Sequence, residues 1–377
     1  MKDIKHILDC LSLVALAASL LASCDYLDVT PERRSTLDDA LKTNTNANDW
    51  TQSCYIPVRD FEPMNYHMIE SSTDEFVEPQ LWATEGQKIS WNNVSNTFEG
   101  TNARGSRWYD WYGYIGHANL FLQQLNAYNP QGLTDSDRVQ YQAEVKFCKA
   151  WDHFRLMNIY GPIPIMDTIQ SRNTTSSDFP GRSHYDYCTD YVVRLLNEAA
   201  AKLPATYSLG QMYGRANATV CVALKSRVLL YDASPLWNGS FPYSTWKNET
   251  YETPGYGKEL VSHKYDKTKW QRALQAALDA INIAETKGGR KLMDLETANT
   301  IAEAQGVPLP YVPEITEQYN TETSRPKAQQ DANLITKLRT FLERVRMLRF
   351  ISNSTETEGN KEIIFVTPDQ VDHNYDM

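Results

Sequence analysis

Apolar residues recur along this chain at steps of three and four residues, the spacing that gathers side chains on one face of an α-helix. The first strong stripe starts at Trp108 and continues through Tyr112, Ile115 and Leu122. A second stripe covers residues 139–160 and stops at a Gly-Pro pair. Glycine there supplies a left-handed cap, and proline prevents the helix from continuing. The pattern predicts two long helices in this part of the chain.

Further stripes follow, separated by segments rich in turn-forming residues. The other predicted helices are a short one that includes Trp50, and the ranges 183–204, 218–233, 269–287 and 332–345. Ser183 and Asp186 have the spacing of a capping box at the start of the range 183–204. Long loops are expected at 165–182, 234–268 and 296–331. No strand-rich region competes, so we predict a mainly all-α fold, a tetratricopeptide-like scaffold of helical hairpins with long inserted loops.

The first residues have the pattern of an export signal. Lys2 and Lys5 precede an apolar run at 7–22, which is shorter than the roughly 20 residues that a membrane span needs. The run leads into Leu-Ala-Ser-Cys, with the cysteine at position 24, as in bacterial lipoprotein signals. We expect residues 1–23 to be removed and Cys24 to be acylated, the alternative being a buried structural cysteine. Several acyl chains on Cys24 would give stable membrane attachment.

Composition narrows the function classes. A formal net charge of −10 argues against a nucleic-acid-binding surface, which needs clustered basic residues. The 22 Tyr and 9 Trp outnumber the 11 Phe, and rings with a polar handle suit hydrated binding surfaces. The chain therefore has the composition of a binding protein with many aromatic contacts.

Catalytic signatures are missing from the sequence. We find no GxSxG, HExxH, P-loop or dinucleotide-binding glycine motif, and the seven histidines are scattered singly. His153 is expected to be a packed residue rather than a base. Asp74 and Glu75 are adjacent, which does not produce the facing separation of roughly 5–9.5 Å that glycoside hydrolysis needs. We expect no enzyme, no metal site and no cofactor.

Four cysteines remain beyond the anchor, at positions 54, 148, 188 and 221. No two of them form a CxxC pair. Cys148 and Cys221 lie among apolar residues of predicted helices, so both are expected to be small buried hydrophobes. We predict no disulfide, although an exported protein would permit one.

Seven segments in order carry a resemblance to a known family. They are DYLDVTPE after the lipoprotein cysteine, SSTDEF, RWYDWYGYIGHANLFLQQL, AEVKFCKAWDHFRLMNIYGPIPIM, NEAAAKLP, LLYDASPLWNG and NKEIIF. Their order and spacing resemble those of the SusD/RagB family of outer-membrane nutrient-binding lipoproteins. Members usually continue well beyond the last segment, so the resemblance implies that residues 24–377 form the N-terminal helical part of that fold, truncated at the C-terminus.

The resemblance implies a function and a partner. Family members are lipid-anchored, cell-surface proteins of the outer membrane that capture oligosaccharide or peptide and deliver it to a TonB-dependent, SusC-like transporter barrel, without catalysis. Glycan binding is the leading hypothesis. A peptide-binding member of the same family, a glycoside hydrolase, and a purely structural protein whose rings all pack are the alternatives.

One set of ligand-binding residues is expected in the loop at 74–107. Sugar binding needs aromatic faces for pyranose rings and polar groups for hydroxyls. The loop offers both, in Trp82, Trp91, Asn92, Asn93 and Arg104. The starch-binding members use a tryptophan and an asparagine in this region, which the resemblance matches to Trp82 or Trp91 together with Asn92.

A second aromatic set lies in the loop at 234–268. Tyr243 and Trp246 are the candidates for exposed ligand contacts, whereas Trp237, within SPLWNG, is expected to pack against the scaffold. Three further tryptophans belong to the helical stripes and are predicted to be core residues, namely Trp108, Trp111 and Trp151. For each loop ring, simple packing is the competing interpretation.

Overall fold

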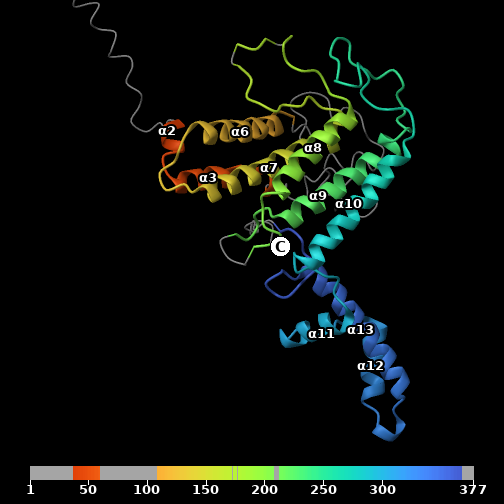
Figure 1. The fold of residues 1–377 in the computed structure, drawn as a ribbon. Helices are drawn as coiled ribbons and strands as arrows, with labels where there is room; N and C mark the ends of the chain where they lie inside the picture. The colour runs from red at the N-terminus through yellow and green to blue at the C-terminus, as the bar shows by residue number, and fades with distance from the viewer. Residues whose placement is uncertain (1–36, 60–107, 172, 176, 208–211, 367–377) are drawn as a thin grey trace, which may run out of the picture.

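The computed structural model describes residues 37–59, 108–171, 173–175, 177–207 and 212–366 (Figure 1). The N-terminal part contains α2 (Leu37–Ala40), α3 (Asn44–Ser53) and α4 (Ile56–Arg59). The central helices are α6 (Trp108–Ala127), α7 (Asp135–Tyr160), α8 (Tyr185–Ala200), α9 (Ala218–Ala233) and α10 (Lys267–Thr286). The last helices are α11 (Leu295–Ala304), α12 (Pro313–Thr323) and α13 (Ala332–Asn353). Within these ranges there are no β-strands, only isolated β-bridges. This confirms the all-α prediction.

The five central helices form a stack in which each packs against the next along the chain. Ile115 on α6, Leu156 on α7 and Leu196 on α8 are fully buried in its core. The contact between α9 and α10 uses small side chains, because the inner face of α10 buries alanines at positions 273, 276, 280 and 284. Small residues let helix axes approach closely, as in tetratricopeptide-like hairpins, and this arrangement confirms the predicted scaffold.

The helix ends follow local chemistry. Thr134 and Asp137 form a capping box that starts α7. Gly161 ends that helix with φ of 66°, a conformation that favours glycine, as predicted. The predicted capping box at Ser183 is wrong. His184 is the N-cap residue of α8 instead, and its Nδ1 accepts from the backbone N–H of Asp186.

The predicted loop at 296–331 is also wrong, because α11 and α12 lie within it. Of its ten residues α11 buries only two alanines and Asn299, and α12 buries only Glu322, so neither helix shows a stripe of large apolar side chains. Local signals still start them, since Asp294 caps α11 and Pro313 is the first residue of α12. Together with α13 they form an arm that extends away from the stack (Figure 1).

The other core predictions can be checked residue by residue. Trp111 is buried, and Trp108 and Trp151 are partly buried against the same core. His153 is fully buried, with Nδ1 on the carbonyl of Lys149 and its ring against Tyr191. All four of the cysteines in the described residues are buried. None of the described helices is both long enough and apolar enough to cross a membrane.

Candidate functional site

Two loops lie together at one end of the helical stack (Figure 1). One follows α7 and leads into α8, and the other connects the short 3₁₀ helix Pro235–Trp237 to α10. They are joined by the amide of Asn248, which donates to the carbonyl of Arg182 at 2.7 Å, and by the hydroxyl of Thr253, which accepts from the N–H of His184 at 2.9 Å. The segment that contains Tyr243 and Trp246 is therefore fixed against the start of α8.

Aromatic rings stack in series through this loop. Trp237 lies parallel to Tyr185, the first residue of α8, with ring centroids 4.0 Å apart and an interplanar angle of 7°. Phe241 stacks next, 5.6 Å from Trp237, and Trp246 stacks 5.2 Å beyond Phe241. We call Tyr185, Trp237, Phe241 and Trp246 the aromatic stack. It begins in the core and ends at the partly exposed ring of Trp246.

Arg182 lies beside the outer end of the aromatic stack. Its guanidinium is 5.8 Å from the ring centre of Trp246 and 5.2 Å from that of Trp108, distances typical of cation–π contacts. Nη1 also donates to the carbonyls of Tyr160 and Pro162, at 2.9 and 2.6 Å. The partial burial of the guanidinium lowers the pKa of Arg182 from its ordinary value. The Arg182 cation thus connects the turn after α7, the start of α6 and the loop that contains Trp246.

Tyr243 is the ring of this loop that faces solvent. It is 67% exposed and contacts Phe241 edge to face at 5.8 Å. The expected exposure of Tyr243 is confirmed, and its ligand contact stays a prediction. Trp246 is only partly exposed, because it packs between neighbours rather than standing free. The prediction that Trp237 packs against the scaffold is confirmed by its contact with Tyr185.

The other predicted site residues are Trp82, Trp91, Asn92, Asn93, Arg104 and the lipidation residue Cys24. They lie outside the described residues. Within the described part, sequence reasoning missed Phe241 and Arg182. The apolar Phe241 in a polar loop and the Arg-Ser-His sequence before α8 were the available signals.

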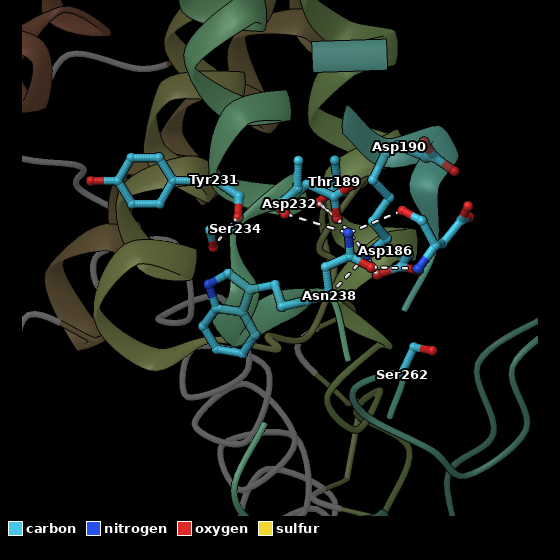
Figure 2. Close-up of polar contacts among 12 residues, drawn as sticks. Asp186, Thr189, Asp190, Tyr231, Asp232, Ser234, Asn238 and Ser262 are labelled. Atoms are coloured by element: carbon cyan, nitrogen blue, oxygen red, sulfur yellow. Dashed lines mark hydrogen bonds and ion pairs between the residues drawn. The ribbon is translucent and has the colours of Figure 1, made fainter. Parts of the chain in front are cut away.

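A buried ionic cluster joins α8, α9 and α10 (Figure 2). Nζ of Lys269 donates to Asp186 at 2.6 Å, to Asp232 at 3.1 Å and to the carbonyl of Trp237 at 3.0 Å. Thr189 donates a further hydrogen bond to Asp232. Burial raises the pKa of Asp232 to about 6, although the neighbouring ammonium opposes that shift.

This cluster contains the kinds of groups that an acid–base site uses, but they are too buried for a ligand to reach. Lys269 and Asp232 are 5% and 1% exposed, and both bond each other and the surrounding chain. Oδ1 of Asp186 also accepts a hydrogen bond from the Lys269 ammonium. Ring faces and hydrogen-bonding groups at the surface suit the binding of a sugar, whereas these carboxylates serve structure. No group of three or more potential metal ligands occurs in the part of the chain described.

A groove away from the aromatic stack lies between α6 and the α3–α4 region. It has a volume of about 400 Å³ and is lined by Ser53, Ile56, Tyr109, Asp110, Gly113, Tyr114 and His117. Tyr109 is 86% exposed at its edge, and Nε2 of His117 lies 2.7 Å from the hydroxyl of Ser53. None of the predicted site residues lines this groove.

Comparison with known proteins identifies the class. The SusD-like family described as "Starch-binding associating with outer membrane" matches residues 25–230, more than half of the chain. This protein therefore belongs to the SusD-like family. No curated protein sequence matches it.

This chain is also similar to solved structures. The protein BT4246 is 38% identical, with a TM-score of 0.73, over 87% of this chain and 51% of its own. A selenomethionine form of BT4246 gives 38% identity and a TM-score of 0.69, over 86% and 50% of the two chains. A SusD-like protein from Bacteroides fragilis, BF3747, is 18% identical with a TM-score of 0.47, over 71% and 44%. The chain thus spans about half the length of these solved proteins.

Proposed function

We propose that this protein is a lipid-anchored glycan-binding protein of the outer membrane, exposed at the cell surface. It captures oligosaccharide and delivers it to a TonB-dependent, SusC-like transporter, without cleaving it. Membership of a family described as starch-binding and associated with the outer membrane carries the proposal. The exposed ring of Tyr243, held on a rigid aromatic stack, supports it.

The proposed ligand surface combines the described loop with predicted residues elsewhere. Tyr243 and the edge of Trp246 would stack on sugar rings, and Trp82, Trp91, Asn92 and Arg104 would add ring faces and hydrogen bonds. Stacking on an aromatic face tolerates many sugars, so several glycans can share such a surface. Acylated Cys24 would hold the surface at the membrane.

Glycan binding is tested with the chain from residue 25 onward, titrated with starch oligosaccharides and with plant, host and microbial glycans in a calorimeter. We expect a micromolar to millimolar Kd for at least one glycan and no released product. Tyr243→Ala should weaken that binding about tenfold, which corresponds to about 1.4 kcal/mol. Tyr311→Ala is the matched control, because Tyr311 is 62% exposed but lies just before α12 in the arm.

Each contrary outcome points to a different function. Loss of binding in Tyr109→Ala but not in Tyr243→Ala would move the site to the groove beside α6. Cleaved sugar from pure protein would indicate a hydrolase. A well-folded chain that binds peptides and no glycan would select the peptide-binding alternative, and one that binds neither would indicate a purely structural protein.

The anchor and the partner need separate measurements. Metabolic labelling with a lipid precursor should mark the wild-type protein but not Cys24→Ala, and equal labelling would contradict lipidation at Cys24. Co-purification with a transporter barrel from outer membranes tests the delivery step. Retrieval of no barrel protein would argue against it.

A further inference from the structure

The loop at residues 239–265, here called the aromatic loop, has its two ends side by side, while Asn248 and Thr253 hold its middle against the start of α8. Asn238 follows the 3₁₀ helix, and Asp266 is the N-cap of α10. Nδ2 of Asn238 donates to the carbonyl of Asp266 at 3.0 Å, and Oδ1 accepts from its N–H at 2.7 Å. One side chain thus pairs with both backbone groups of a residue 28 positions away. We call this pairing the neck of the loop.

The chain is closely packed at the neck. Gly239 has φ of 93°, and a Cβ placed there would come within 2.7 Å of the backbone nitrogen of Tyr265. Only glycine fits that conformation and that distance without strain. Asn238 itself is 2% exposed, so its amide has no access to water as an alternative partner.

Lys269 joins the neck to three helices. It lies in the first turn of α10 and reaches Asp186 on α8, Asp232 at the end of α9, and the carbonyl of Trp237 immediately before Asn238 (Figure 2). The ammonium therefore links α10 to α8, to α9 and to the 3₁₀ helix from which the loop departs. Its contact with the Trp237 carbonyl also lies next to the ring on which Phe241 stacks, and Trp246 stacks in turn on Phe241.

We propose that Asn238 and Lys269 are positioning residues for ligand binding, which hold the aromatic loop in its binding geometry without touching the ligand. This inference rests on the proposed glycan-binding function. The central helices have their own packing in the core and the α9–α10 contact, so the neck is not what holds the stack together. Loss of the neck bonds would loosen the part of the loop next to the neck, which includes Phe241 and Tyr243, while the bonds of Asn248 and Thr253 to the start of α8 and the helices stay in place.

The decisive variant is Asn238→Ala, with Asn299→Ala as its matched control. Asn299 is also buried, at 7% exposed, and also makes both kinds of hydrogen bond, to the carbonyls of Leu295 and Glu343 and from Arg346. It lies on α11, in the arm. Both variants lose a buried amide, so both should lower the unfolding temperature. Only Asn238→Ala should weaken the Kd for the glycan that the wild-type protein binds, on the order of tenfold.

Hydrogen exchange distinguishes local loosening of the loop from a general loss of stability, because it reports on each segment separately. In Asn238→Ala, amides of residues 240–247, between the neck and Asn248, should exchange faster while those of α7 and α8 keep their protection. Lys269→Arg keeps the charge and should restore most of the affinity lost in Lys269→Met. That pair tests the same assignment if Asn238→Ala fails to fold.

Two results would overturn the assignment in distinguishable ways. If the wild-type protein binds a glycan and Asn238→Ala and Asn299→Ala bind it equally well, the neck does not position the site, and the proposed function stands. If the wild-type protein binds no glycan in the panel, the proposed function fails and the assignment fails with it.

Discussion

Arg215→Met is predicted to be the most destabilising single change in the described core. The carboxylate of Glu144, on α7, is 0% exposed. It accepts from Nε of Arg215 at 2.7 Å, from the hydroxyl of Tyr55 at 2.9 Å and from the amide of Gln140 at 2.9 Å. Arg215 is itself 6% exposed. Its guanidinium is the only cation that these contacts bring to Glu144, so the substitution leaves a buried carboxylate with neutral partners.

The expected magnitude follows from that geometry. Breaking a buried ion pair by removing one partner costs about 3–5 kcal/mol, because the remaining charge stays desolvated. Arg215→Met should therefore lower the free energy of unfolding by about 3–5 kcal/mol. Adding Glu144→Gln removes the stranded charge, and the double variant should be more stable than Arg215→Met alone. Measured together with the single variant Glu144→Gln, that recovery gives the coupling between the two sites.

The assay is urea unfolding followed by circular dichroism of the helices. Arg194→Met is the control, because the side chain of Arg194 is 49% exposed and pairs with Glu198 at 3.0 Å. An exposed pair of this kind contributes about 0–1 kcal/mol. The reasoning fails if Arg215→Met is no more destabilising than Arg194→Met, or if adding Glu144→Gln lowers stability further.

Three further predictions concern stability. Gly161→Ala should cost about 2–4 kcal/mol in urea unfolding, because φ is 66° and the new Cβ would lie 2.8 Å from the Trp237 ring; a loss below about 0.5 kcal/mol would contradict this. Burial lowers the pKa of His153 from 6.5 to about 4, so the unfolded state binds the imidazole proton more tightly than the folded state does. As pH falls from about 6.5 to 4, up to about 3 kcal/mol of folding stability is therefore lost. His153→Gln should flatten that part of the stability curve. Asp232 has the opposite sign, since its pKa is raised to about 6 and the folded state gains stability as pH falls through 6 toward 4, a gain that Asp232→Asn should remove.

The long helices were predictable from the sequence because their apolar stripes are wide and their ends are marked. Gly161 ends α7 where the pattern places its end, and the stripe that begins at Trp108 corresponds to α6. The helices of the arm were not predictable in the same way. They bury alanines together with Asn299 and Glu322. Asn299 also bonds the carbonyl of Glu343 on α13, and Glu322 accepts from the N–H of Asp331, contacts that the spacing of apolar residues does not reveal.

The candidate site was predictable only in part. Exposure of Tyr243 follows from its polar, turn-rich surroundings, and the structure agrees. The stacking of Trp246 does not follow from them, because it depends on the path of the loop. That path is set by Asn238 and Asp266, whose pairing joins distant positions and has no local signal.

The ends of four helices meet beneath the aromatic loop. This arrangement separates buried positions that hold the loop in place from exposed positions that can be replaced. Gly161 ends α7, Tyr185 starts α8, Trp237 follows α9 and Lys269 lies in the first turn of α10. A change at any of these positions disturbs buried contacts and so costs stability. Tyr243, in contrast, projects from this base with most of its side chain in water, so its replacement costs the fold little. Under the proposed function, ligand preference would change at the exposed positions of the loop while the buried positions keep the loop in place.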